Sequence, residues 1–428
     1  MMRELALPRL FMRGALGLVL ACGLSVSACA RQEAEAAVVS PSEALEADFS
    51  QLGQRLDYLA AQDRFMGVVL VARGDQVLFR QAYGMADREG GAPLRPDSRL
   101  RLASISKQFT AAAILHLQDE GKLSVEDPVC RWITPCPAGW ETMRISHLLS
   151  HTSGLPDLMQ RPDWGRRRVQ PTTLAELTAQ TMLYRPQFEP GTKTDYNNAA
   201  YNLAADIVQR ASGLSYNDYL QQTFFDPLGM ADTGSDADDL GHGIVYGYTD
   251  YSGTKARHPV SNVSVVWGAG ALYSTVDDLL KWEQALHGGR LLSLESYRQM
   301  IADHAPSGQP LRPGARPRAW GYGQFVSDLP VSVVPAFSAA QIYHTGSWAG
   351  FRNMESYEPR SGVFVIVLTN NYHQTDEVFL VVQQAMASAL GEPFPAALRE
   401  DPLPSATQPA APATDPPTPI LRPADPAR

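Results

Sequence analysis

The sequence predicts an α+β fold in which helices flank an antiparallel β-sheet and a mainly helical subdomain is inserted beside it. Two β-branched runs lie around Gly74-Asp75, and short strand-like runs return after residue 320. The region between them, about 104–257, is mostly helical in its apolar spacing. Strands from the two ends of the chain can share one sheet only if this helical region is an insertion.

The individual elements follow from local patterns. Residues 66–83 predict a hairpin, and an apolar stripe predicts a helix that starts near Ser104 and stops at Gly121. A short helix ends at the Gly-Leu-Pro of "ISHLLSHTSGLPD", and "NNAAYNLAADIVQRASG" predicts a longer one that ends before Gly213. Three runs, "QIYHTGS", "FRNMESYE" and "VFVIVLTN", predict antiparallel strands, and a last helix is expected at about 375–390. Acidic residues after Ser274-Thr275 predict one further helix start there.

Composition limits the classes of function. The chain has 428 residues, 44% of them apolar, which is enough for one large core or two smaller ones. The formal net charge is −9 and no long Lys/Arg run interrupts it, so we expect no nucleic-acid partner. We also expect no cofactor and no metal ion.

The N-terminus has the features of a targeting segment. A basic start precedes the short apolar core 14–28, which ends in Val-Ser-Ala-Cys29. This ending resembles a bacterial lipobox, so 1–29 is interpreted as a lipoprotein-type signal peptide with Cys29 as the lipidated residue. Because Ala30 and not Asp follows, we expect an outer-membrane lipoprotein that faces the periplasm and contacts the membrane only through its lipid. The alternative is ordinary cleavage and secretion to the periplasm.

The remaining chain divides by composition. Residues 30–43 are interpreted as a tether. Nine of the 32 prolines lie in the last 28 residues, so the Pro/Ala-rich tail 398–428 is expected to be disordered. The folded domain is then 44–397, with an α/β part at about 44–103 and 258–397.

Cys130 and Cys136 are the two cysteines of the folded domain. An exported chain meets an oxidising compartment, so a local disulfide between them is a candidate. A zinc site would need more Cys or His ligands nearby.

The first candidate for chemistry is Ser104, with Lys107 three residues later. The two side chains share one face of a helix, and a buried lysine amine can lose its proton and accept one from a serine hydroxyl. The alternative is an N-cap serine followed by a solvent-exposed lysine.

The second candidate is Tyr196-Asn197-Asn198, just before a predicted helix. A phenol beside a lysine can shuttle protons, with its ionised form favoured by the cation, and Asn198 offers a donor and an acceptor for a substrate amide. The alternative is a core aromatic residue and a helix cap.

The third candidate is His344-Thr345-Gly346 at the end of a strand. Gly346 permits close approach of a ligand, His344 could carry or relay charge, and the N–H groups of Ser347 and Ser104 could form an oxyanion hole. The alternative is a lone surface histidine.

Together these three motifs, in this order, resemble the class C β-lactamase, serine DD-peptidase and esterase superfamily. Segments such as "GAGALYSTVDDLLKWEQAL" and "WGYGQF" also look like that family, and the resemblance covers about 44–395. It implies a β-lactamase/transpeptidase-like fold with Ser104, the acylated nucleophile, at the junction of the two parts. It also implies that Lys107 and Tyr196 handle the proton, that Asn198 contacts the substrate amide, and that the 344–347 strand lines the cleft.

One position departs from the class C pattern, because His344 stands where those β-lactamases carry lysine. A neutral histidine holds a carboxylate less well than a lysine does, so the sequence favours a DD-carboxypeptidase or esterase over a β-lactamase. The expected substrate is a small molecule or a peptide, which includes peptidoglycan-derived ones. A non-catalytic muropeptide-binding protein is the alternative from another class.

Two weaker signals complete the sequence analysis. His147 and His151 are spaced as a helical metal pair but lack the glutamate of a zinc protease. Three aromatic residues could wall the cleft, although aromatic residues more often pack in cores: Trp320, Tyr322 and Trp348.

Overall fold

The computed structural model describes residues 47–237, 243–250, 254–259, 261–306, 318–327, 333–334, 340–373 and 375–397. The predicted signal peptide, its Cys29, the tether and the tail 398–428 lie outside these residues.

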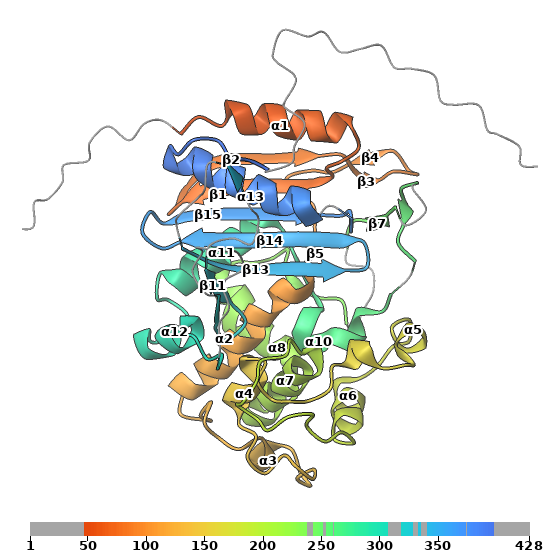
Figure 1. The fold of residues 1–428 in the computed structure, drawn as a ribbon, viewed down its shortest axis with the longest axis vertical. Helices are drawn as coiled ribbons and strands as arrows, with labels where there is room; N and C mark the ends of the chain where they lie inside the picture. Colours follow the sequence, from red (N-terminus) through yellow and green to blue (C-terminus); the bar gives the residue numbers. More distant parts are fainter. Residues whose placement is uncertain are drawn as a thin grey trace, which may run out of the picture. The chain divides into compact units, whose positions relative to one another are not determined.

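The main helices and strands in chain order share one domain (Figure 1). The helices are α1 (Ser50–Ala61), α2 (Ser106–Asp119), α3 (Val129–Trp132), α4 (Ile145–Leu149), α5 (Trp164–Arg167), α6 (Leu174–Thr181), α7 (Asn198–Ser212), α8 (Tyr216–Leu220), α9 (Asp226–Leu228), α10 (Trp267–Gly270), α11 (Val276–His287), α12 (Leu294–Ile301) and α13 (Thr375–Leu390). The strands are β1 (Gly67–Arg73), β2 (Gln76–Tyr83), β3 (Met85–Asp87), β4 (Ala92–Pro93), β5 (Leu100–Arg101), β6 (Gly234–Ser235), β7 (Tyr248–Thr249), β8 (Ala256–Arg257), β9 (Leu272–Ser274), β10 (Ala319–Trp320), β11 (Phe325–Ser327), β12 (Val333–Val334), β13 (Gln341–Trp348), β14 (Phe351–Glu358), β15 (Val363–Thr369) and β16 (Ala396–Ala397).

A seven-stranded antiparallel sheet joins the two ends of the domain. Its strand order is β10-β11-β13-β14-β15-β1-β2, and the five long strands lie one below another in Figure 1. Strand β1 pairs with its hairpin partner β2 on one side and with β15 on the other, from Gly67 opposite Thr369 to Arg73 opposite Val363. This pairing confirms the predicted fold class, because strands from before and after the helical region share one sheet.

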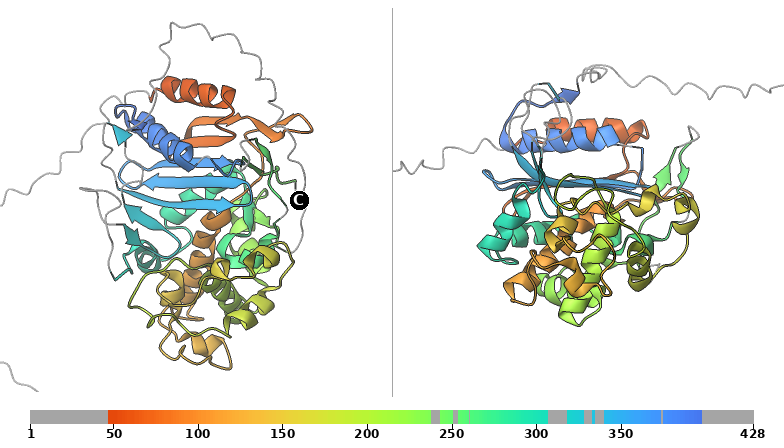
Figure 2. Two further views of the ribbon diagram at one scale, coloured as in Figure 1. Left: turned by 45° about the vertical axis from the view of Figure 1, so that its right-hand side comes forward. Right: turned by 60° about the horizontal axis from the view of Figure 1, so that its bottom comes forward.

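Each face of the sheet has its own apolar core, as the alternation of strand side chains requires. Val69 and Val71 pack with α1 and α13 on one face. Val68 and Leu70 belong to the core of the other face, which includes α2, α7 and α11. The right-hand view of Figure 2 shows α13 on one side of the sheet and the helical subdomain on the other. Within the described residues, no helix is both long and apolar enough to span a bilayer.

Helix α2 is more deeply buried than its sequence pattern predicts. The predicted stripe is buried, but so are Lys107, Gln108 and Thr110 on the rest of the helix. The reason is that α2 packs against α7, α10 and α12. The segment 263–270, which the sequence placed with the sheet part, also packs on α2 and α7. The helical subdomain therefore takes in residues on both sides of 257.

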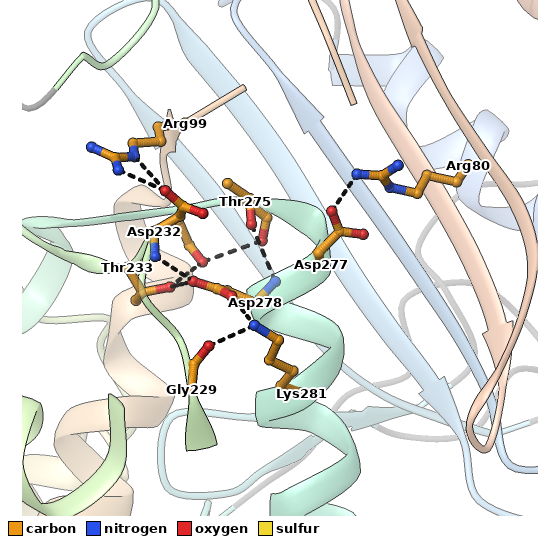
Figure 3. Close-up of polar contacts among 10 residues, drawn as sticks. Arg80, Arg99, Gly229, Asp232, Thr233, Thr275, Asp277, Asp278 and Lys281 are labelled. Atoms are coloured by element: carbon orange, nitrogen blue, oxygen red, sulfur yellow. Dashed lines mark hydrogen bonds and ion pairs between the residues drawn. The ribbon is translucent and has the colours of Figure 1, made fainter. Parts of the chain in front are cut away.

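Helix α11 begins where the acidic residues predict. Thr275 is its N-cap and accepts a hydrogen bond from the Asp278 N–H at 3.2 Å. The Asp278 carboxylate accepts from the Asp232 N–H at 2.8 Å and pairs with Lys281 at 2.7 Å, while Asp277 pairs with Arg80 of β2 (Figure 3). These contacts hold the start of α11, and with it the neighbouring strand β9, in a fixed place.

The candidate cysteine pair lies at the far end of the helical subdomain. A disulfide joins Cys130, in α3, to Cys136, and their Cα atoms are 4.9 Å apart.

Candidate active site

Ser104 lies in a short 3₁₀ turn, Ala103–Ile105, between β5 and α2. Ala103, directly before it, has a φ of 51°, a left-handed conformation that is strained for a residue with a side chain. Both neighbours of Ser104 are buried, whereas Ser104 itself is partly exposed. The strained turn thus lifts one hydroxyl to the surface at the N-terminal end of a buried helix.

Gly346 lets this turn pack tightly on the sheet. A Cβ atom at position 346 would lie 2.1 Å from the Leu102 carbonyl oxygen. The Asn353 Nδ2 of β14 donates to the Arg101 carbonyl at 2.7 Å, which holds the same backbone in place. The expectation that Gly346 makes room for a ligand is therefore wrong. The close approach is made by the protein's own backbone, which fills that space and fixes Ser104 against β13.

Lys107 is the central polar group of the site. Its side chain is fully buried, and its Nζ lies 3.1 Å from Ser104 Oγ, 2.9 Å from Asn198 Oδ1 and 2.8 Å from the Ala269 carbonyl oxygen. Burial lowers the pKa of Lys107 to about 7, although the Asp157 carboxylate opposes this shift. Burial thus brings the neutral form of the Lys107 amine into the neutral pH range.

The contacts of Lys107 orient its lone pair when it is neutral. A neutral amine has two hydrogens and one lone pair, and two of its three neighbours are carbonyl oxygens that can only accept. Both hydrogens are therefore donated to Asn198 and Ala269. The lone pair is left for the Ser104 hydroxyl, which donates its proton to the amine.

Tyr196 lies beside Lys107, but its phenol is not ionised. Its ring centroid is 4.7 Å from the Lys107 Nζ, and its side chain hydrogen-bonds Ser104. Burial nevertheless raises the pKa of Tyr196 above its usual value, and the hydrogen bond with Ser104 only partly offsets this. The expectation that the cation favours the phenolate is wrong, because burial and the nearby Asp157 charge both favour the protonated phenol.

Asn198 is committed to the protein at both ends of its amide. Its Oδ1 accepts from Lys107, and its Nδ2 lies 3.1 Å from an Asp157 carboxylate oxygen. The same carboxylate accepts from the Asn198 and Met159 N–H groups. Asn198 therefore orients the lysine amine, in addition to lying at the surface that a substrate would meet.

His344 is neither charged nor on the surface. Its side chain is 1% exposed, and burial, together with the Lys107 charge, lowers its pKa to about 3. Its Nδ1–H donates to the Thr345 carbonyl at 2.7 Å, which leaves Nε2 as an acceptor with no hydrogen-bond partner among the described residues. The ring is therefore neutral at neutral pH, so of the two roles expected for His344, to carry or to relay charge, the first is wrong, and so is the alternative of a surface histidine.

A cavity of about 560 Å³ collects these groups. Six of the eight sequence-predicted catalytic and substrate-binding residues line it: Ser104, Tyr196, Asn198, His344, Thr345 and Ser347. Lys107 and Gly346, the other two, lie beneath its surface. Of the three aromatic residues considered for the wall, Trp320 lines the cavity, whereas Tyr322 stacks on His304 and Trp348 contacts Trp164.

The sequence did not single out several residues of this site. Asp157 and Arg318 line the cavity, and the Ala269 carbonyl binds Lys107. Asp157 could have been found from the sequence, because it directly follows the Gly-Leu-Pro that ends the short helix. Arg318 and Ala269 come from distant parts of the chain and had none.

His151 packs against Tyr196, and its hydrogen bond goes to the backbone. Its ring stacks on the Tyr196 ring at 4.4 Å, and its Nδ1 accepts from the Asn197 N–H at 3.0 Å. His147, the other half of the supposed metal pair, accepts from the Arg144 N–H instead. In the part of the chain that the structure describes, no group of three or more His, Cys, Asp or Glu side chains could hold a metal ion.

An antiparallel sheet beside a helical insertion, with a serine, a buried lysine and a tyrosine at their junction, defines a class of serine-dependent acyl-transfer hydrolases. A family model described as Beta-lactamase matches residues 45–385. The chain therefore belongs to this family and is a serine hydrolase that works through an acyl-enzyme.

The similar proteins include penicillin-binding proteins and an esterase. A penicillin-binding protein of Bacillus subtilis (strain 168) is 28% identical over 353 residues, which cover 78% of this chain and 75% of the relative. The esterase EstB of Burkholderia gladioli is 28% identical over 386 residues, which cover 79% of this chain and 95% of the relative. A solved penicillin-binding protein from Bacillus halodurans superposes with a TM-score of 0.65 at 25% identity, over 78% of this chain and 99% of that one.

Proposed function

We propose that Ser104 is the nucleophile of this serine hydrolase and that neutral Lys107 is its general base. The observation that carries the proposal is the position of the buried Lys107 amine, whose Nζ lies 3.1 Å from Ser104 Oγ while its other two hydrogen bonds go to carbonyl oxygens. In the first step Ser104 Oγ bonds to the substrate carbonyl carbon while its proton passes to Lys107 Nζ.

The developing oxyanion has two candidate donors, the N–H groups of Ser104 and Ser347. In the described part of the sheet, β11 pairs with β13 only as far as Tyr343, so the β11 side of the strand at Ser347 has no strand partner. Ser347 lines the same cavity as Ser104. Each donor of an oxyanion hole typically contributes about 3 kcal/mol to transition-state stabilisation.

Tyr196 remains protonated and hydrogen-bonded to Ser104, so it can donate its proton to the leaving group. Protonated Lys107 then returns a proton to the phenolate, which restores both groups. Water attacks the acyl-enzyme in the second step and releases the acid and free Ser104. The side chains named here and one water molecule are sufficient for both steps, so the reaction needs no cofactor.

The substrate class that we propose is an amide or ester of the DD-carboxypeptidase or esterase type. The names of the similar proteins, a penicillin-binding protein and an esterase, support these two chemistries. The uncharged His344 argues against a β-lactamase, because it offers no fixed cation for the β-lactam carboxylate.

A parallel assay of the pure protein tests this proposal. The substrates are a D-alanyl-D-alanine peptide, a short-chain nitrophenyl ester and a chromogenic cephalosporin. We expect turnover of the peptide or the ester at a kcat/KM at least about 10-fold above that of the cephalosporin, a factor equivalent to about 1.4 kcal/mol. Faster hydrolysis of the cephalosporin, or hydrolysis of none of the three, would contradict the proposal.

We further propose that the protein works in the cell envelope as an outer-membrane lipoprotein anchored through Cys29. The support is the basic start, the short apolar core and the small residues before Cys29. Expression with a labelled fatty acid should give a membrane-bound, labelled protein, and Cys29→Ser should release an unlabelled one. Label that stays on the Cys29→Ser variant would refute the anchor.

A further inference from the structure

The direction of the Asn198 side-chain amide decides whether Lys107 can act as a base. The amide places its Oδ1 2.9 Å from the Lys107 Nζ. If the amide were turned over, its NH₂ group would face the amine instead. A neutral amine could accept from that N–H only with its lone pair, which would leave no lone pair for the Ser104 proton. The structure must therefore hold Asn198 in one of its two amide orientations.

The Asp157 carboxylate determines which orientation Asn198 takes. Its Oδ2 accepts from the Asn198 backbone N–H and from the side-chain Nδ2 at 3.1 Å, while its Oδ1 accepts from the Met159 N–H at 2.8 Å. A carboxylate can only accept, so a turned amide would bring two acceptor oxygens together. Both side chains are buried, which makes such an unsatisfied contact costly. Asp157 thus keeps the Asn198 oxygen directed at Lys107.

Among the described groups, Asp157 also supplies the charge that acts on Lys107. Four other titratable side chains lie around the Lys107 amine or respond to its charge: His151, His344, Tyr196 and Tyr201. Burial lowers the pKa values of the histidines and raises those of the tyrosines, so all four are uncharged at neutral pH. Arg318 lines the same cavity, and its charge helps to lower the pKa values of the two histidines.

We propose that Asp157 is a positioning residue of the acylation step, which holds the Asn198 amide in the orientation that aims the Lys107 lone pair at Ser104. Asp157 acts through Asn198 and not on the reacting atoms. Its negative charge has a second effect, because it raises the pKa of Lys107 and that of Tyr196. The inference rests on the proposed function, since Asp157 has this task only if Lys107 is the base.

Asp157→Asn tests the proposal through the pH profile of kcat/KM for a nitrophenyl ester between pH 5 and 9. The new amide can donate as well as accept, so Asn198 is free to turn over. We expect the plateau to fall by about 100-fold, the size of a small misplacement of reacting groups. The midpoint of the rise should also move to a lower pH, because the charge that favours protonated Lys107 is gone. A loss of packing alone would not move this midpoint.

Two further variants separate the charge of Asp157 from its position. Asp157→Glu keeps the charge and moves the carboxylate by one methylene, so the plateau should fall while the midpoint stays close to that of the unaltered protein. Asp163→Asn is the matched control, since it removes the same charge from the same loop at a residue that pairs with Arg161 and Arg167. It should leave the midpoint unchanged. Melting curves show whether each variant is folded at the assay temperature.

Two kinds of failure can be told apart. An Asp157→Asn profile with the plateau or the midpoint of the unaltered protein would overturn the role of Asp157 alone. If Asp157→Asn is unfolded, an unchanged plateau in Asp157→Glu would overturn it equally. No rise between pH 5 and 7 in the unaltered protein would instead overturn Lys107 as the base, and the inference with it.

Discussion

Replacing Ser104 with alanine is expected to lower kcat/KM for an ester substrate by at least about 10,000-fold, the loss typical of removing a serine nucleophile. Among the described residues, Ser104 has the hydroxyl that hydrogen-bonds the Lys107 amine, so other hydroxyls lack this activation. The variant should also lose the acyl-enzyme that intact-mass measurement detects in the unaltered protein. Because Ser104 is partly exposed, the melting temperature of the Ser104→Ala protein should differ little from that of the unaltered protein.

Ser106→Ala is the matched control for this experiment. Ser106 lies two residues away, and its buried hydroxyl accepts from the Leu272 N–H at 3.2 Å without contacting the cavity. It should retain the acyl-enzyme, even if it melts at a lower temperature. Covalent labelling that persists in Ser104→Ala and disappears in Ser106→Ala would show that Ser106, and not Ser104, is the nucleophile.

The parts of the fold that were predictable are those with a local cause. Gly74-Asp75 separates two β-branched runs whatever surrounds them, and Gly213 ends α7 in the left-handed conformation that glycine adopts easily. The pairing of β1 with β15 agrees with the expectation that the helical region is an insertion between strands of one sheet. Depth of burial was not predictable, since the polar residues of α2 are covered by helices that come from three other parts of the chain.

The same distinction applies to the site. Ser104, Lys107 and Tyr196 were recognisable by spacing and order, and the structure brings all three together. A neutral Lys107 was expected only if the side chain is buried, and the protonated Tyr196 was not expected, because both pKa values depend on burial that no spacing encodes. The close contact between Gly346 and the Leu102 carbonyl joins segments more than two hundred residues apart, so no local pattern revealed it.

The pKa values also narrow a choice that the sequence left open, the identity of the base. A group can act as a base at neutral pH only if a useful fraction of it is unprotonated. The lowered pKa of Lys107 meets this condition, whereas the raised pKa of Tyr196 does not. The structure therefore favours Lys107 as base and Tyr196 as the acid that follows it.

Lys107→Met is expected to lower kcat/KM by about 1,000-fold, within the range that a general base contributes. In the unaltered enzyme kcat/KM should rise with pH up to about 7, where Lys107 becomes neutral, and then level off. The methionine variant should lose this rise, because the group that titrates is gone. A pH–rate profile between pH 5 and 9 for both proteins measures the difference.

The pH dependence of the free energy of unfolding gives an independent check on the pKa of Lys107. The pKa of Lys107 is about 7 when folded and 10.5 for an ordinary lysine, so between these values unfolding takes up one proton. The free energy of unfolding should therefore gain about 1.4 kcal/mol per pH unit from this group between pH 7 and 10. Lys107→Met should lack this gain, whereas Lys122→Met, at a half-exposed lysine, should keep it. A rise in kcat/KM that persists in Lys107→Met, together with unchanged pH dependence of unfolding, would show that Lys107 stays protonated and that another group is the base.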